Sequence, residues 1–229
     1  VRALYRELLS RLAAVGGVER VGATSHLPMY NFGTNGEMQR EGGNLWGPNE
    51  APLVEYRYFT GDYLQALDIP LVRGRMLDTR DGANTNSVLI NQAMADKFWP
   101  GEDPIGKRFG QGNPPTQWWE VVGVVGNIRS FGLTRSVPLE FYRTIDQSIA
   151  SSLTVVVRTH GEQPDAVVPA ARQIVASIDP ALPVTAVQRM DEVVAASVGQ
   201  PRFLTALSTL FGALAGLLAM VGVYGVMTY

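Results

Sequence analysis

The feature that most constrains this chain is an uncharged apolar run at residues 203–229, with the sequence FLTALSTLFGALAGLLAMVGVYGVMTY. A helix over this run would be roughly 40 Å long, at about 1.5 Å per residue, and the hydrocarbon core of a bilayer is about 30 Å thick. All charged residues, 19 basic and 21 acidic, lie before this run. We therefore expect a water-soluble body over residues 1–200 and a transmembrane helix over residues 201–229.

A helix buried inside a large soluble protein is the alternative for this run, since such a helix is also apolar all round. Buried helices are usually shorter, and about 18 or more apolar residues without charge favour a membrane span. Within the run, Ser208, Gly212 and Gly216 recur every fourth residue and so share one helix face. Small residues at this spacing let two membrane helices approach closely, so we expect these three to form a helix-packing surface.

The overall composition excludes several classes of function. The formal net charge is −2 and no cluster of Lys and Arg is present, so a nucleic-acid partner is not expected. The chain has no cysteine, which excludes disulfides and zinc–thiolate sites. It starts at Val1 without an initiator Met and stops at the end of the apolar run. We expect it to be a segment of a longer polypeptide.

The remaining sequence predicts an α+β fold, because helices and strands alternate too irregularly for a doubly wound sheet. Apolar spacing predicts helices at residues 2–15, 62–67, 91–99, 163–178 and 191–197, the last leading into the apolar run. Alternating or β-rich runs predict strands at residues 18–24, 53–59, 87–90, 118–125, 138–143, 153–158 and 183–188. Residues 29–50 are rich in Gly and Asn, which predicts a loop or a loose hairpin.

One stretch resembles a nucleotide site. Residues 101–108, GEDPIGKR, match the G-x-x-x-x-G-K spacing of a phosphate-binding loop. Arg108, however, stands where a Ser or Thr hydroxyl must bind magnesium, and the stretch follows a predicted helix instead of a strand. Two acidic residues and a proline inside the loop would also disfavour phosphate. We therefore interpret residues 101–108 as a turn.

No other motif supports catalysis, a cofactor or a metal. His26 and His160 lie in separate loops without a second ligand at metal-binding spacing. Ser130 lacks the glycine two residues before it that a nucleophile elbow requires. Residues 78–84, DTRDGAN, approach a calcium-binding loop but lack its central Gly and terminal Glu, and we expect a solvated turn there. The sequence thus predicts no catalytic residue, no cofactor and no metal ligand.

Three tryptophans, Trp99, Trp118 and Trp119, have two interpretations. They could line an apolar groove that contacts a ligand. Aromatic residues beside strands are more often part of the buried core, and we expect that outcome.

Four segments of the chain carry a family resemblance: residues 62–75 (DYLQALDIPLVRGR), 88–107 (VLINQAMADKFWPGEDPIGK), 120–127 (EVVGVVGN) and, in the apolar run, 221–226 (VGVYGV). Together they resemble MacB-like periplasmic domains followed by an FtsX-like permease helix. The FWPGEDPIGK stretch is the most specific of these. The chain is most similar to orphan permeases with duplicated halves, which have no ATPase of their own.

The resemblance implies a two-lobed domain. Residues 1–59 and 138–200 would form a porter-like lobe, residues 60–137 an inserted mixed α/β lobe, and residues 201–229 the transmembrane helix. Residues 1–200 would lie in the periplasm and the helix in the bacterial inner membrane. No catalytic residue is carried over.

The resemblance also implies a function and a set of partners. The domain would couple ATP-driven movement in a separate cytoplasmic ATPase subunit to export or to a periplasmic adaptor or effector protein. A second permease half would complete a homodimer or pseudo-dimer. Two rivals remain at this point: a membrane-tethered ligand-binding or sensor module, and a membrane-anchored hydrolase.

Overall fold

The structure is a computed structural model, and the chain divides into two compact units, Val1–Val187 and Gln188–Tyr229. It describes residues 2–31, 33–43, 46, 50–112, 114–133, 135–147, 152–161, 164–182, 184 and 186–227, with backbone alone at 198–207, 210, 213, 221, 225 and 226.

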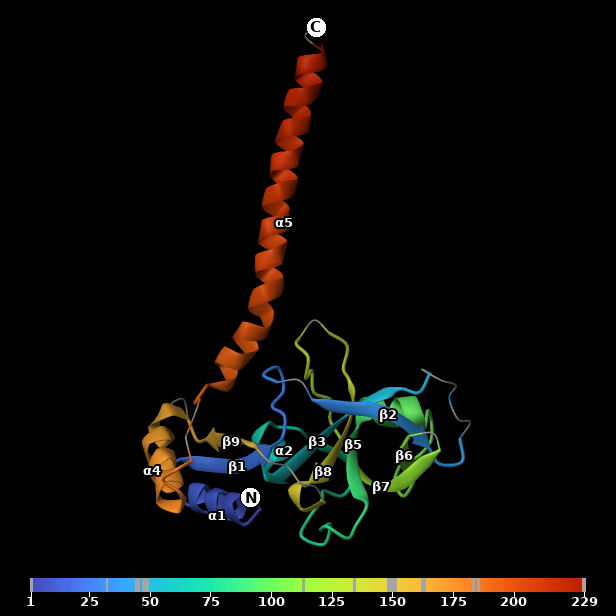
Figure 1. Ribbon diagram of the computed structural model, residues 1–229, viewed down its shortest axis with the longest axis vertical. Coiled ribbons are helices and arrows are strands. Elements are labelled where there is room, and N and C mark those ends of the chain that lie inside the picture. The colour runs from blue at the N-terminus through green and yellow to red at the C-terminus, as the bar shows by residue number, and fades with distance from the viewer. Residues whose placement is uncertain are drawn as a thin grey trace. The chain divides into compact units, whose positions relative to one another are not determined.

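The first unit is built on one mixed sheet of nine strands (Figure 1). The strands are β1 Val18–Thr24, β2 Thr34–Arg40, β3 Leu53–Gly61, β4 Leu71–Gly74, β5 Ser87–Asn91, β6 Arg108–Gly112, β7 Pro115–Val125, β8 Leu139–Thr144 and β9 Thr154–Thr159. Their order is β2-β6-β7-β5-β8-β3-β1-β9, with β4 paired to β7. The β3–β8 and β5–β7 pairs are parallel and the other pairs are antiparallel.

Helices cover the sheet and connect its strands. They are α1 Arg2–Ala13, α2 Tyr63–Ala66, α3 Gln92–Phe98, α4 Val168–Ile178 and the short 3-10 helices η1 Ile145–Gln147 and η2 Pro164–Val167. The start of α3 is fixed by Asn91, the last residue of β5, whose Oδ1 accepts a hydrogen bond from the Met94 amide at 3.0 Å. An asparagine at this position satisfies an amide that the helix itself leaves unpaired.

Six of the strands form a closed ring. The pairings run β2-β6-β7-β5-β8-β3, and the ring closes because β2 also pairs with β3. Small strand rings have no room for a channel, and side chains fill their interior. Every strand of the ring contributes to this core, together with α3: Met38, Val54, Val88, Ile90, Met94, Ala95, Phe98, Trp99, Phe109, Trp119, Val121, Val124 and Phe141. We call this assembly the strand ring.

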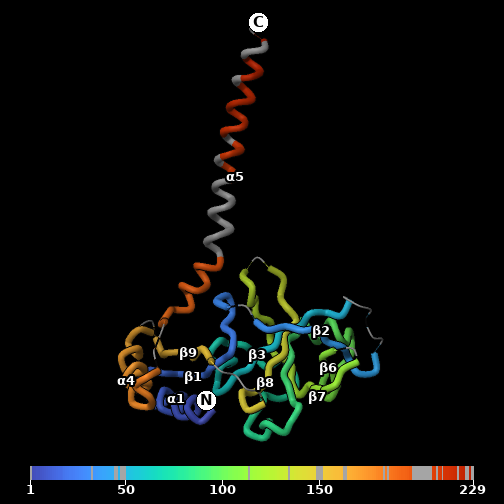
Figure 2. The backbone as a smooth tube through the Cα atoms, in the orientation of Figure 1, coloured from blue at the N-terminus to red at the C-terminus, as the bar shows by residue number. Residues whose placement is uncertain are grey.

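Two further cores lie outside the strand ring. One packs α2 against the outer faces of β3, β5, β7 and β8, through Phe59, Tyr63, Leu64, Ile69, Leu89, Val125 and Tyr142. The other packs α1 and α4 against β1 and β9, which lie side by side in Figure 2, through Leu8, Leu9, Leu12, Val21 and Ala23. The two sides of β1 thus serve different partners. Val21 and Ala23 belong to the core with α1, and Gly22 lies against Tyr63 of α2.

The second unit consists of α5, Met190–Met227, a helix of 38 residues. Most of its described side chains beyond residue 207 are exposed in the structure, including Phe211, Leu218, Met220 and Tyr224. Among the described residues, no helix combines the length and apolarity that crossing a membrane requires. The membrane-spanning role expected for residues 201–229 stays a prediction.

Most expected elements are confirmed, with bounds shifted by a few residues. The strand expected at 183–188 is wrong, since the described residues 184 and 186–188 are irregular; residues 183 and 185 lie outside the described part. Val187 is 47 % exposed, so no burial favours pairing there. The region 29–50, expected to be a loop or a loose hairpin, contains β2, and β4 and β6 were not expected.

Candidate binding site

A cavity of about 280 Å³ lies at one end of the strand ring. Side chains of β3, β6, β7 and β8 line it: Tyr56, Tyr58, Gln111, Thr116, Gln117, Trp119, Phe141 and Arg143. The other end is occupied by α3, which follows directly from the last residue of β5. Because β8 runs antiparallel to β5, Arg143 near the end of β8 lies away from α3. The cavity is therefore the open end of the strand ring, a common place for ligands in closed sheets.

Strand alternation places the aromatic lining of the open end. Val54, Tyr56 and Tyr58 share the inner face of β3, as expected for residues two apart in a strand. In the parallel pairing of β3 with β8, Tyr56 lies beside Phe141 and Tyr58 beside Arg143. The rings of Tyr56 and Phe141 have centroids 5.6 Å apart. The cavity therefore has an aromatic wall with one cation at its rim.

Arg143 is held mainly by rings. Its guanidinium carbon lies 5.8 Å from the Tyr58 centroid and 5.5 Å from the Trp119 centroid, within the range of a cation–π interaction. Its Nη2 donates to the Gln147 carbonyl at 3.0 Å. Burial lowers the pKa of Arg143, and neighbouring Tyr58 acts in the opposite direction. Among the described residues, no carboxylate lies within ion-pair distance of Arg143.

Within the described residues, two hydrogen-bond donors of the cavity wall have no acceptor. Trp119 is only 4 % exposed, and its Nε1 has no partner within the described part of the chain. The Nε of Arg143 is likewise buried and unpartnered there. Buried donors almost always find an acceptor, because an unmade hydrogen bond costs free energy. The cavity wall therefore lacks acceptors for these two N–H groups.

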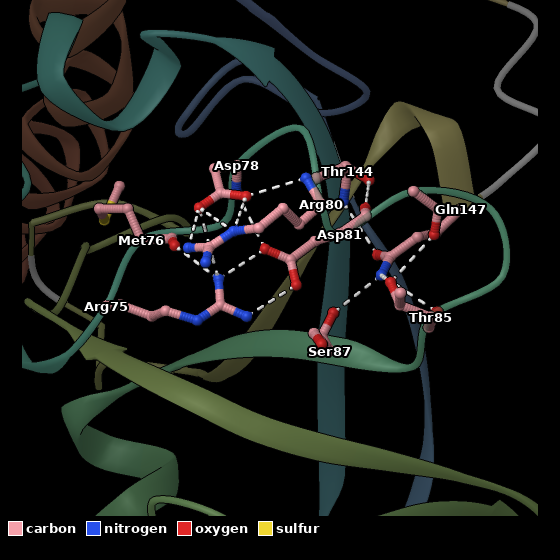
Figure 3. Close-up of polar contacts among 10 residues, drawn as sticks. Arg75, Met76, Asp78, Arg80, Asp81, Thr85, Ser87, Thr144 and Gln147 are labelled. Carbon is pink, nitrogen blue, oxygen red and sulfur yellow. Dashed lines mark hydrogen bonds and ion pairs between the residues drawn. The ribbon is translucent and has the colours of Figure 1, made fainter.

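A network of ion pairs fastens the loop before β5 to the end of β8 (Figure 3). Arg75 donates from Nη1 and Nη2 to Asp81 at 2.6 and 2.9 Å, and Arg80 donates to Asp78 at 2.6 Å. Thr144 Oγ1 donates to the Asp81 carbonyl at 2.9 Å. The arrangement holds the loop against the strand that carries Arg143.

The expectation of a solvated turn over residues 78–84 is wrong for Asp81, which is 2 % exposed. Arg75 neutralises its charge, and the hydrogen bonds from Arg75 lower the pKa of Asp81 despite burial. Asp78 and Asn84 are exposed, as a solvated turn requires. Close by, Gln147 Nε2 donates to the Ser87 carbonyl at 2.9 Å. This hydrogen bond fixes Gln147, whose own carbonyl accepts from Arg143.

A buried ion pair lies on the opposite faces of β3 and β8, outside the strand ring. Arg57 donates from Nε and Nη2 to Glu140 Oε1 at 3.0 and 2.8 Å. Ser130 Oγ donates to the same oxygen at 2.6 Å, and Tyr142 donates to Oε2 at 2.5 Å. Burial opposes the charge of Arg57, yet the adjacent Glu140 raises its pKa above the usual value. Arg57 Nη1 also donates to the His26 carbonyl at 3.0 Å. This network was not expected from the sequence.

The interpretation of residues 101–108 as a turn is confirmed. Gly101 and Gly106 both have positive φ, which glycine adopts without strain. The Gly106 amide donates to the Val121 carbonyl at 2.8 Å, and Lys107 is paired with Glu102. The amides and the lysine that a phosphate would need are thus engaged within the protein.

The tryptophan expectation is confirmed for Trp99 and Trp119, which belong to the core of the strand ring. Trp119 also lines the cavity, so the two interpretations are not exclusive for it. Trp118, on the other face of β7, is half-buried. Spacing alone did not show that Trp119 and Arg143 meet, because they come from strands that are not neighbours in the sheet.

Ser208, Gly212 and Gly216 all lie in α5. Ser208 and Gly212 are exposed, and a Cβ built at Gly212 or Gly216 meets no atom of this chain within 4 Å. Their role in helix packing stays a prediction.

The chain belongs to the family of MacB-like periplasmic core domains, whose model matches residues 2–189. Among solved structures, it is similar to the periplasmic region of MacB from Actinobacillus actinomycetemcomitans, with a TM-score of 0.52 and 13 % identity over 75 % of this chain and 72 % of that one. The extracellular domain of the noncanonic ABC-type transporter YknZ from Gram-positive bacteria gives a TM-score of 0.49 and 18 % identity, over 75 % and 81 % of the two chains. No curated protein matches the chain.

Proposed function

We propose that this chain is the extracytoplasmic domain and adjoining helix of an ABC transporter permease of the MacB/FtsX type. It would couple ATP-driven movement in a separate cytoplasmic ATPase subunit to export or to a periplasmic adaptor or effector. One observation carries the proposal: the family match ends at residue 189, and a helix of 38 residues begins at Met190. The family domain is therefore joined to a long helix without an intervening linker.

The character of α5 supports a membrane role for residues 201–229. A helix of this length reaches roughly 57 Å at about 1.5 Å per residue, well beyond the bilayer core. Its exposed apolar side chains need lipid or another protein around them, because exposed apolar surface is unfavourable in water. We infer that the helix lies in the bacterial inner membrane, with residues 1–200 in the periplasm.

A two-lobed division of the body is part of the proposal. Residues 1–59 and 138–200 would form the porter-like lobe, and residues 60–137 the inserted lobe. The core of α1, β1, β9 and α4 supports this, because all its members come from the two ends of the segment. β2 and β8 of the porter-like lobe pair with β6 and β5 of the inserted lobe, so movement of one lobe would be passed to the other through these strand pairs.

Labelling in intact cells tests the topology, and residues 1–229 contain no cysteine that would compete for the label. In the full-length protein, Lys97→Cys places a thiol on the exposed side of α3. A membrane-impermeant maleimide should label this thiol in intact cells, whereas Leu217→Cys in α5 should stay shielded until the membrane is dissolved. Labelling of Lys97→Cys only after lysis would place the body in the cytoplasm and contradict the proposal.

Helix packing has its own test. Replacing both Gly212 and Gly216 with Leu should impair assembly or activity and leave the body folded, because it blocks the close approach of a second helix. Leu214→Phe with Leu218→Phe is the matched control, since it enlarges the opposite face of α5. Unchanged transport or signalling in the glycine double variant would refute the packing role.

The cavity at the open end of the strand ring favours a second candidate function, a membrane-tethered ligand-binding or sensor module. The two candidates differ in topology. A permease requires further membrane spans in the full-length protein, and a sensor needs only one.

A further inference from the structure

The open end of the strand ring combines a cation with two buried hydrogen-bond donors. Trp119 Nε1 and Arg143 Nε are both donors, both buried, and both without an acceptor in the described part of the chain. They belong to residues of the same cavity wall. A ligand that satisfies both must bring acceptor oxygens. The missing partner is thus an acceptor and not a second donor.

The positive charge of Arg143 further restricts the chemical class of the ligand. Other arginines of the body meet carboxylates at short range: Arg57 meets Glu140 and Arg108 meets Glu41. Arg143 has no such partner among the described residues, and its guanidinium lies against rings instead. A guanidinium fork matches the two oxygens of a carboxylate, and that pairing is stronger when both groups are shielded from water.

The walls and the size of the cavity indicate what the carboxylate is attached to. Tyr56 and Tyr58 line the cavity and can pack against an apolar or aromatic group, with the buried Phe141, 1 % exposed, behind Tyr56. A volume of about 280 Å³ admits a group the size of one aromatic side chain with its carboxylate.

We propose that the open end of the strand ring binds a carboxylate carried on an apolar or aromatic group, with Arg143 and Trp119 as the donors. Because both nitrogens are buried in the structure, a ligand reaches them only if the surrounding side chains move. A free aromatic acid and the C-terminal residue of a peptide share this chemistry. The inference does not depend on the transporter assignment.

Nuclear magnetic resonance of the full chain in detergent micelles tests the proposal directly, through the tryptophan indole N–H signals. The probe is N-acetylphenylalanine, and its amide is the control of equal shape without the charge. The acid should shift the Trp119 signal saturably and leave the Trp118 signal unmoved. The amide should bind with an affinity at least about tenfold lower, as expected for the loss of a charged hydrogen-bond pair.

Two pairs of variants separate binding from packing. Arg143→Gln should weaken binding of the acid about tenfold or more, and Arg172→Gln, on the exposed side of α4, should leave it unchanged. Trp119→Phe keeps a ring but removes the N–H, and Trp118→Phe is its control on the other face of β7. Thermal unfolding of each variant shows whether the strand ring stays folded. Because Arg143 lies at the rim and not in the core, its variant remains decisive if Trp119→Phe unfolds.

The source of the carboxylate follows from a second probe, the peptide Gly-Gly-Gly-Phe with a free C-terminus. Tighter binding of the peptide than of N-acetylphenylalanine identifies a chain terminus as the ligand, and weaker binding identifies a small acid. Either result supports the proposal. No saturable shift of the Trp119 signal, equal binding of acid and amide, or unchanged binding by Arg143→Gln would show that Arg143 only closes the ring, and would overturn it.

Discussion

Replacing Glu140 with glutamine should destabilise the body strongly, although the change removes only one charge. Glu140 is fully buried and accepts hydrogen bonds from Arg57, Ser130 and Tyr142. Glutamine leaves the Arg57 guanidinium, which is 1 % exposed, without a counter-charge. Removing one partner of a buried ion pair costs about 3–5 kcal/mol. That is a large part of the roughly 5–15 kcal/mol by which domains are stable.

The assay is thermal unfolding of the purified chain in detergent, followed by circular dichroism at neutral pH. For a domain of this size, about 1 kcal/mol corresponds to a shift in Tm of roughly 2–4 °C, so we expect a fall of about 10 °C. Glu41→Gln is the matched control, because Glu41 pairs with Arg108 on the surface at 2.6 Å. Exposed pairs contribute about 1 kcal/mol or less, so its Tm should barely move.

A double variant separates the lost charge from lost packing. Glu140→Gln combined with Arg57→Met removes both charges, and should recover part of the stability that Glu140→Gln alone loses. A fall in Tm for Glu140→Gln no larger than that for Glu41→Gln would refute the argument. Equal Tm for the single and the double variant would show that the unpaired guanidinium is not the cause.

Further predictions concern the close contact at α2 and the loop before β5. Gly22→Ala should lower the free energy of unfolding by about 1–3 kcal/mol or more, because a Cβ there would lie 2.2 Å from the Tyr63 amide nitrogen. Gly16→Ala, which meets no atom within 4 Å, should change it little, and equal effects in thermal unfolding would contradict the packing argument. Asp81→Asn should cost about 2 kcal/mol at pH 7, because the bonds from Arg75 favour the charged carboxylate. Since the folded-state pKa of Asp81 is lowered, this stability is present above the unfolded pKa of about 4 and is lost as the pH falls through the folded value. Denaturant titrations at several pH values should therefore show that the difference in free energy of unfolding between wild type and Asp81→Asn shrinks in acid. A difference that stays constant with pH would contradict the role given to the charged Asp81 carboxylate.

Local pattern was enough to predict the strands whose apolar residues recur along a short run. β1, β3, β5 and β8 were expected within one or two residues of their observed bounds. β2, with the sequence TNGEMQR, gave no such pattern, because Gly36 leaves one inner position without a side chain. β2 and β6 are specified by pairing with each other and with distant strands, and this information is absent from any single window.

The candidate site was missed for the same reason, and the buried ion pair for a different one. Tyr58, Trp119 and Arg143 come from three strands that are far apart in the sequence, and only the sheet topology brings them together. Charged positions in a strand usually face solvent, but β3 is covered on both faces, so Glu55 and Arg57 are buried. Glu55 and Arg57 share a strand face with Phe59, and this was the one sign in the sequence that they are buried. Leu53, on that same face, is exposed.

Closure of the strand ring also sets how this chain must fold. In the pairing of β2 with β6, 71 positions separate Gln39 from Gly110, and in that of β3 with β8, 85 separate Tyr56 from Phe141. Bringing such distant strands together costs loop-closure entropy before the contacts between them form and stabilise the pair. Folding is therefore slow. The backbone N–H and C=O groups at the edges of β2 and β3 therefore stay partly unpaired until most of the body has been synthesised. During that interval the nascent chain is at its most prone to aggregate.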